Sequence, residues 1–351
     1  MAKTIIGLEI TEEGVRAAEV TTGRTPTLVA FGAVPLPDGA AKDSEVLDPD
    51  AVTLALHRLW SGARFSSRRV VLGIGSRRIL VREYTTQALR PDLLRQALPF
   101  QVQDLLPVPA DQAVLDFYAS SQTGGEITGL LVAAVAETVE LLVSTIGKAK
   151  LTVDAVDLAP FGLARAVSRL AAPGESVAAL HLGDHTSYVV IVRDGVPRFV
   201  RILPLEILTD AVRERQLAAA PPVEEEADLV VEELVGAAAS GSSSSRRRRG
   251  AVARSERAAG MTEAALADLV GRMRSTLSFY AGRANDVPVS RVILTGAGAA
   301  AAEVGDSLAA SLPLPVAYIS ASDVVSAKIA PQGTVGLDLL TTVGLALGER
   351  R

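Results

Sequence analysis

One strand–turn–strand pattern occurs twice in this chain, and the repetition limits the folds that the chain can adopt. The first copy, TIIGLEITEEGVRAAEV, runs from Thr4 to Val20 and turns through residues 11–14. The second copy, AALHLGDHTSYVVIVRDGV, runs from Ala178 to Val196 and has Gly183 in its turn. Apolar strands joined by a short turn that contains glycine are typical of β-hairpins. Two such hairpins, one in each half of the sequence, predict a duplicated fold with a ligand cleft between the halves.

Composition limits the class of protein and its partners. The 351 residues predict at least two domains, and the hydrophobic fraction of 48%, mostly Ala, Val and Leu, supplies large cores of small side chains. A net charge of −5 gives no basic field for nucleic acid. The absence of cysteine excludes disulfides and thiolate metal sites, and three histidines are too few for a multi-histidine metal site.

The start of the chain carries no sign of secretion. MAKTIIGLEITEEG has a single lysine before a short apolar run, then acidic residues, and no small-residue cleavage site. No uninterrupted apolar stretch approaches the roughly 20 residues of a membrane span. We therefore expect a soluble, cytoplasmic protein.

Apolar periodicity predicts the elements of the first half. Strands are expected at 4–10, 15–20, 27–34, 70–75 and 152–158, and helices at 50–61 and 160–170. Between them, strands at 79–84, 114–119 and 130–136 and helices at 90–103 and 137–148 have the pattern of a small α+β subdomain. The expected domains are a first lobe, 1–75 with 151–172, and an inserted subdomain, 76–150.

The second half is expected to form a second lobe, 173–351. After the hairpin, strands are expected at 199–203, 289–295 and 316–319, and helices at 205–216, 261–280, 300–311 and 335–347. Residues 218–259 combine an acidic stretch, a serine run and four arginines, which is the composition of a low-complexity insertion.

The turns predict a phosphate site. Glycine permits the backbone of a turn to direct N–H groups at a phosphate, and a carboxylate at the strand end can hold Mg²⁺. A third glycine turn, between a strand and a helix, can lie against a flat purine ring and brings a helix N-terminus close. The candidate binding residues are Glu9, Thr11, Gly14, His181, Gly183, Thr186, Gly296 and Gly298, with Glu9 as the candidate metal ligand.

Structural explanations compete with these functional ones. Glu9 can be a solvated acid at a strand end, and Gly296 and Gly298 can serve turn geometry alone. His181, which has apolar neighbours, is better explained as a packed, hydrogen-bonded histidine than as a catalytic base. His185 is expected to be exposed in its turn.

Several segments together resemble the PilM family of type IV pilus assembly proteins. The segments are IIGLEITEEGVRAAEV, LRQALPFQVQDLLPVPADQAVLDFY, AVDLAPFGLARA, LHLGDHTSYVVIVRDGVPRFVR, VILTGAGAAAAEVGDSLAASLPLPV and TVGLALGER. The second is the most specific, with a helix, a Pro-x-Pro break and a Val-Leu-Asp-Phe strand. The resemblance implies an α/β, actin-like (ribonuclease H-like) two-lobe fold with an inserted α+β subdomain, and it implies ATP and Mg²⁺ as cofactors.

Both phosphate turns depart from the family pattern, which has an aspartate at the strand end followed by Ile-Gly and small hydroxyl residues. The first turn has Glu12 and Glu13 in place of hydroxyl residues, and the second has His181 at the aspartate position, followed by Asp184 and His185 after the glycine. Crowded acids repel a triphosphate by about 1 kcal/mol or more per contact. We therefore expect weakened or lost nucleotide binding and no enzymatic activity beyond a weak ATPase.

The resemblance implies an assembly role. The expected protein is a cytoplasmic scaffold that docks the cytoplasmic tail of a PilN-like inner-membrane protein. It would link the inner-membrane pilus platform to the motor ATPase, with membrane contact only through its partners. Two alternatives stay open: an active ATP-hydrolysing protein of the same fold, and an FtsA-like division protein. The basic amphipathic helix that usually ends FtsA does not follow TVGLALGER, which disfavours the latter.

Overall fold

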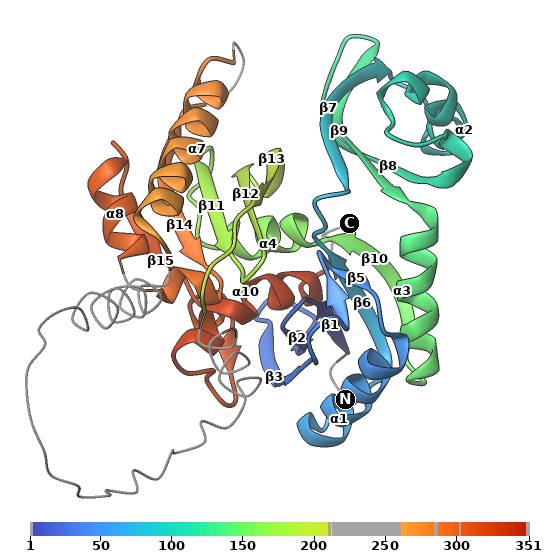
Figure 1. Ribbon diagram of the computed structural model, residues 1–351. Coiled ribbons are helices and arrows are strands. Elements are labelled where there is room, and N and C mark those ends of the chain that lie inside the picture. The colour runs from blue at the N-terminus through green and yellow to red at the C-terminus, as the bar shows by residue number, and fades with distance from the viewer. Residues whose placement is uncertain (1–2, 210–211, 213–260, 284–286, 302, 349–351) are drawn as a thin grey trace, which may run out of the picture.

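Two sheets of the same design form the two lobes of the protein. The computed structural model describes residues 3–209, 212, 261–283, 287–301 and 303–348 (Figure 1). The first lobe contains a six-stranded sheet with the order β10-β6-β1-β2-β3-β16. Its strands are β1 (Thr4–Ile10), β2 (Gly14–Thr21), β3 (Thr27–Pro35), β6 (Arg69–Ile74), β10 (Thr152–Leu158) and β16 (Ser326–Ala327).

The second lobe contains a five-stranded sheet with the order β13-β12-β11-β14-β15. Its strands are β11 (Ser176–Leu182), β12 (Thr186–Arg193), β13 (Val196–Pro204), β14 (Val289–Thr295) and β15 (Val316–Tyr318). In both sheets three antiparallel strands are followed by two parallel ones, so β3-β2-β1-β6-β10 matches β13-β12-β11-β14-β15. The predicted duplication is confirmed.

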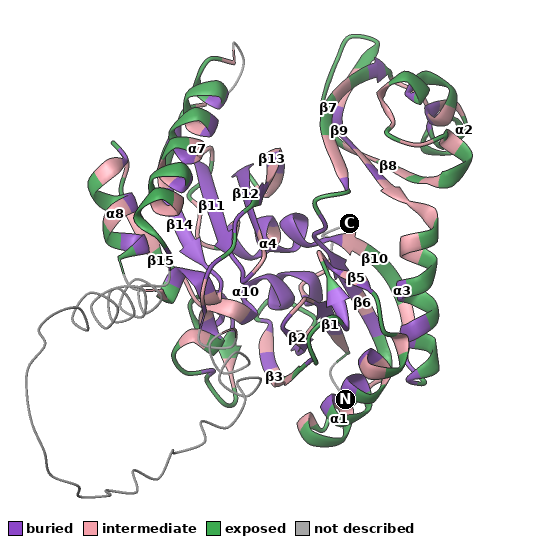
Figure 2. Cartoon of the chain, in the orientation of Figure 1, coloured by how far each residue is buried: buried purple, intermediate pink, exposed green. Residues whose placement is uncertain are grey.

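Two helices hold the lobes together. α4 (Ala159–Val167) packs on β12 of the second lobe, whereas α10 (Thr334–Ala346), near the C-terminus, packs on β1 and β2 of the first. The two helices also contact each other closely, because a Cβ atom at Gly344 would overlap the carbonyl oxygen of Gly162. Both are largely buried at the centre of the molecule (Figure 2). The polar ends of the two hairpins are therefore brought to one place by a well-packed apolar core.

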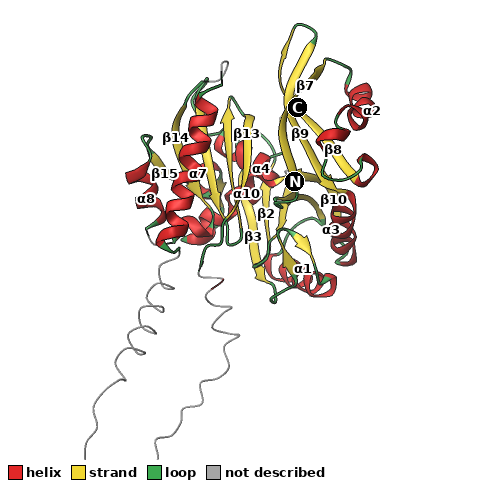
Figure 3. Ribbon diagram, turned by 45° about the horizontal axis from the view of Figure 1, so that its top comes forward, coloured by secondary structure: helices red, strands yellow, loops and turns green. Residues whose placement is uncertain are grey.

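Other helices cover the outer faces of the sheets. α1 (Pro49–Ala63) and α3 (Ala136–Lys148) lie against the first sheet, and α7 (Glu263–Ala281) and α8 (Val304–Ser311) against the second (Figure 3). The shorter elements are the hairpin of β4 (Ala41–Lys42) and β5 (Glu45–Val46), the helix α9 (Ala321–Val324), and the 3₁₀ turn η3 (Ala297–Ala300). No helix among the described residues is long and apolar enough to cross a membrane.

A module stands beside the lobes. Its sheet has the order β7-β9-β8, with β7 (Leu80–Gln87), β8 (Ala113–Thr123) and β9 (Glu126–Val135), and its helix is α2 (Pro91–Gln101). Two 3₁₀ turns, η1 (Gln103–Leu105) and η2 (Ala110–Gln112), complete it. The module has its own small core, in which Leu94, Leu98, Val102 and Leu131 pack together. The boundaries 76 and 150 stay predictions.

Two predicted helices begin in the wrong place. Residues 205–209 are not helical, because β13 continues through Pro204 and the N–H of Ile207 donates to the carbonyl of Asp184 at 2.8 Å. The rest of that helix lies almost entirely outside the described residues. The helix expected at 300–311 begins instead at Val304, because Glu303 has a left-handed backbone with φ of 71°. The predicted insertion at 218–259 lies outside the described residues.

Candidate functional site

The turns of the two hairpins face each other across the lobes and are joined by an ion pair. Nε2 of His185, in the second turn, lies 2.8 Å from a carboxylate oxygen of Glu13 and 3.9 Å from one of Glu12, both in the first turn. The hydrogen bond to Glu13 raises the pKa of His185 above its usual value, and burial opposes this. The expectation of an exposed His185 is wrong, because its side chain is only 26% exposed and pairs across the lobes.

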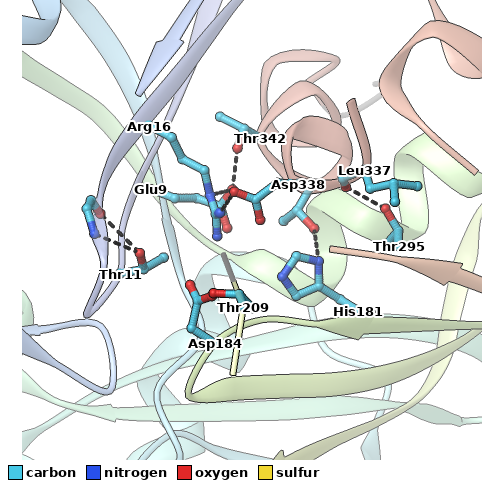
Figure 4. A network of polar contacts seen from close by, with 12 residues as sticks. Glu9, Thr11, Arg16, His181, Asp184, Thr209, Thr295, Leu337, Asp338 and Thr342 are labelled. Atoms are coloured by element: carbon cyan, nitrogen blue, oxygen red, sulfur yellow. Dashed lines mark hydrogen bonds and ion pairs between the residues drawn. The ribbon is translucent and has the colours of Figure 1, made fainter. Parts of the chain in front are cut away.

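Behind the turns lies a charge cluster, in which Glu9, Arg16 and Thr342 are buried and Asp338 is partly exposed (Figure 4). Arg16 on β2 forms an ion pair with Asp338 of α10, and its Nε lies 3.5 Å from the carboxylate of Glu9 on β1. The hydroxyl of Thr342 donates to Glu9. Because α10 belongs to the second half of the chain and the hairpin to the first, the cluster ties the two halves together.

The contacts within the cluster explain the burial and the pKa of Glu9. The residue is 5% exposed, so the interpretation of Glu9 as a solvated strand-end acid is wrong. Burial raises its pKa above the usual value, although the Arg16 cation and the Thr342 hydroxyl oppose this. Burial lowers the pKa of Arg16, but Asp338 and Glu9 raise it to a net value above the usual one. Buried charges persist only when they are paired, and Glu9 is paired by Arg16.

His181 is a packed core residue, as predicted. It is 2% exposed, and its ring stacks on Tyr188 with centroids 4.8 Å apart. The hydroxyl of Thr341 lies 3.4 Å from Nδ1 of His181 and 2.8 Å from the hydroxyl of Tyr188. Burial, and then the nearby Arg16 cation, lower the pKa of His181 to about 3, so the ring is neutral at physiological pH.

Asp184 adds a further acid to the second turn. Burial raises its pKa to about 6, against the hydrogen bond that it accepts from Thr209. The carboxylates of Glu12 and Glu13 lie opposite, across the ion pair with His185. Burial also raises the pKa of Glu12. The space around the turns is therefore strongly anionic.

The candidate residues of the two hairpin turns already contact other parts of the protein. The hydroxyl of Thr11 donates to the carbonyl of Gly14 at 3.1 Å and accepts from its N–H at 3.3 Å. A Cβ at Gly183 would overlap the carbonyl oxygen of Thr186, and one at Gly14 would lie 2.6 Å from the carbonyl oxygen of Val34. Close backbone approach alone thus accounts for both glycines.

Other residues of the protein pack directly against the third turn, which contains Gly296 and Gly298. A Cβ at Gly298 would lie 2.7 Å from Cδ1 of Ile207, and Gly296, with φ of 90°, lies against Leu182. Thr295 donates its hydroxyl to the carbonyl of Leu337 at 2.6 Å, and the N–H of Gly296 donates to the same oxygen at 3.1 Å. The turn is anchored to α10, and contact of its two glycines with a purine stays a prediction.

The structure brings the predicted residues of both hairpins together. The sequence did not lead us to predict two charged residues that pair beside them, Arg16 and Asp338. Arg16 is a single cation within the apolar strand GVRAAEV, and Asp338 is a single acid within the apolar helix TVGLDLLTTVGLA. A charged residue at a core position of such an element needs a partner of opposite charge. The sequence pattern therefore already indicated that both residues form ion pairs. Their spatial proximity depends on the packing of α10 on β1 and β2, which no local pattern in the sequence encodes.

The duplicated sheets, the two interlocking helices and the facing hairpin turns define the class of two-lobed actin-like proteins. Within that class, the sequence model of the type IV pilus assembly protein PilM family matches residues 7–202. The chain belongs to this family.

Comparison with solved structures agrees with the fold. The chain is similar to the structure described as a PilM-PilN type IV pilus biogenesis complex, with a TM-score of 0.77 and 20% identity over 99% of this chain and 98% of that one. It is more distantly similar to the ethanolamine utilization protein EutJ from Carboxydothermus hydrogenoformans, with a TM-score of 0.47 and 13% identity over 99% and 90% of the two chains. The cytoplasmic domain of EpsL of the Vibrio cholerae type II secretion system matches with a TM-score of 0.39 and 14% identity over 64% and 79%.

Proposed function

We propose that this protein is a scaffold of type IV pilus assembly that works by binding other proteins and not by hydrolysing nucleotide. It docks the cytoplasmic tail of a PilN-like inner-membrane protein and links the platform to the assembly motor, at the cytoplasmic face of the inner membrane. The observation that carries the proposal is the ion pair of His185 with Glu13, which joins the two hairpin turns between which a nucleotide phosphate would have to lie.

The residues around these turns do not fit Mg-ATP. Five carboxylates lie in or behind the turns, and two cations, Arg16 and His185, are already paired with some of them. The carboxylates belong to Glu9, Glu12, Glu13, Asp184 and Asp338. A triphosphate would have to break these pairs and then face uncompensated carboxylates, each costing about 1 kcal/mol or more. Among the described residues, no group of three or more acids and histidines is arranged to hold a metal ion.

A shallow depression of about 10 Å³ between the first lobe and the module marks the surface that we propose for the tail. Its apolar floor comes from β6, β9, α3 and Ile79, and its rim carries the ion pair of Arg78 with Glu45 at 2.7 Å. The lining residues are Ser44, Glu45, Ile74, Ser76, Arg78, Ile79, Ala134, Val135, Thr138, Val139 and Leu142. An apolar floor with a polar rim is the usual anatomy of a protein interface. The solved PilM-PilN complex supports the choice of a PilN-like partner.

The test is titration of the purified full chain with a synthetic peptide of the cytoplasmic tail of the organism's PilN-like protein. Thr138→Arg places a long cation in the depression and is expected to weaken binding at least about tenfold, the loss of one central contact. Ser144→Arg, on an exposed position of the same helix α3 and outside the depression, is the matched control and should leave affinity unchanged. Absence of tail binding to the unmodified protein would contradict the proposal.

A further inference from the structure

The unpaired edges of two sheets meet at a groove that the proposed tail site does not use. β7 is the last strand of the module's sheet and β13 is the last strand of the second lobe's sheet. A groove of about 330 Å³ lies between them and the end of α7. Its lining comes from residues 81–83 of β7, Leu130 of β9, residues 198–200 of β13, and Phe279 and Arg283. This volume is typical of pockets that hold a small ligand or a few side chains.

The groove lies beside the edge strand β7 and also reaches the surface of the module's sheet, because Leu130 of the inner strand β9 lines it. Successive side chains of a strand point to opposite faces, so a cavity lined by three consecutive residues of a strand borders the backbone of that strand. Both strands contribute such a triplet, residues 81–83 and 198–200. At an edge, alternate residues direct their N–H and C=O groups away from the sheet, ready to pair with another strand.

The two edges differ in their readiness to accept a strand. β13 contains Pro197 and ends at Pro204, and proline supplies no N–H and is a common means of blocking a sheet edge. β7 has eight residues, LVREYTTQ, without proline, and its pairing with β9 is continuous from Leu80 to Gln87. Among the described residues, β7 has no strand on its other side. β7 is therefore the edge that can take an additional strand.

The side chains around this edge indicate the chemistry of the strand that would bind. Phe279 of α7 is 63% exposed, and its ring lies 5.7 Å from that of Phe199 on β13, which gives the groove an aromatic wall. An exposed aromatic pair is typical of the centre of a protein interface and unusual for free surface.

The charges of the groove are mostly positive. Its lining contains three arginines, Arg82, Arg198 and Arg283, and one acid, Glu83. Arg283 pairs with Glu83 across the groove, whereas Arg82 forms no ion pair with the described residues. Arg198 donates to the carbonyl of Ser120 at 3.0 Å, but its Nε is buried without a hydrogen-bond acceptor in the described part of the chain. A buried donor of this kind is normally paired with an ordered water or a bound group.

We propose that a partner protein adds an extended segment to the edge of β7, with acidic side chains on the arginines and apolar side chains on the Phe199–Phe279 wall. Backbone hydrogen bonds to β7 would supply affinity, and the alternation of acidic and apolar residues would supply specificity. The groove lies between the module and the second lobe, so this contact is separate from the tail site between the module and the first lobe.

The test uses a synthetic peptide of about nine residues that alternates glutamate with valine or phenylalanine, long enough to span β7. Amide hydrogen exchange of the full chain is expected to slow at residues 81–87 when the peptide binds. Phe279→Ala and Arg82→Glu are each expected to weaken binding by at least about tenfold. Phe100→Ala, at an aromatic side chain of α2 that is 80% exposed and outside the groove, is the matched control and should change nothing.

Four results would overturn the proposal. One is equal binding of a peptide whose alternate backbone amides are N-methylated, because such a peptide cannot extend a sheet. A second is no binding at peptide concentrations up to about 1 mM, a free energy of about −4 kcal/mol. A third is self-association of the chain that depends on Phe279, which would assign the groove to a second copy. The last is binding of anionic lipid vesicles that depends on Phe279, which would assign it to a membrane.

Discussion

The facing hairpin turns and the groove beside β7 both involve the second lobe, but their charges are arranged differently. Near the turns, Arg16 pairs with Asp338 and Glu9, and His185 pairs with Glu13. In the groove, arginines outnumber acids and an aromatic ring is exposed. The comparison indicates that the paired charges between the hairpin turns hold the lobes together, whereas the groove leaves an arginine and an aromatic ring exposed to solvent.

The largest expected effect is the loss of the buried cation. Arg16→Met removes the cation that pairs with the buried carboxylate of Glu9 and with the partly exposed carboxylate of Asp338, so we expect the free energy of unfolding to fall by about 3–5 kcal/mol. Chemical denaturation at pH 7 measures it. Arg24→Met, at an exposed position just after the same strand, is the control and should shift stability by less than about 0.5 kcal/mol. Equal effects of the two variants would mean that the charge cluster does not join the lobes.

The next effect concerns the pH dependence that Asp184 imposes. Its pKa rises from 3.8 to about 6 on folding, so the folded state holds the proton more tightly and loses stability as pH rises from about 4 to about 6. Asp184→Asn removes this loss, so the variant should gain up to about 3 kcal/mol over the unmodified protein between pH 4 and pH 7. Denaturation curves at the two pH values give the difference. Parallel pH profiles for the two proteins would contradict a buried, acid-crowded turn.

A smaller effect is expected from the contact between the turns. The pKa of His185 is raised in the folded protein, so its pairing with Glu13 stabilises below pH 6.5 and is lost as pH rises through the folded-state pKa. His185→Gln should therefore cost about 1 kcal/mol at pH 5.5 and close to nothing at pH 9, since the pair is partly exposed to solvent. Thermal unfolding at both pH values tests this. A cost that does not change with pH would rule out an electrostatic contact.

The smallest effect on stability is expected from Phe279 in the groove, because this exposed ring contrasts with the buried ring of the next residue, Tyr280. Phe279→Ala should change the free energy of unfolding by less than about 0.5 kcal/mol, because this ring is mostly exposed. Tyr280→Ala, at the next residue of α7 but fully buried, should cost about 3–5 kcal/mol. Comparable losses in the two variants would show that Phe279 supports the fold and is not held available for a partner.

Local patterns in the sequence predicted most elements and the duplication itself. β1, β10 and β14 have the predicted bounds, because alternation and turn residues determine them. The helix predicted from 205 failed because Leu205 and Ile207 are buried in the core of the second lobe, so tertiary packing decides the backbone there. The charge cluster could not be assembled from the sequence, since Arg16 and Asp338 meet only after α10 packs on β1 and β2.

The central claim is that the paired charges between the hairpin turns exclude nucleotide, and calorimetric titration of the full chain with Mg-ATP tests it most directly. We predict no binding up to about 1 mM, with or without the tail peptide, because the triphosphate would displace His185 from Glu13 and meet the remaining carboxylates. Saturable binding with a micromolar Kd would contradict this account.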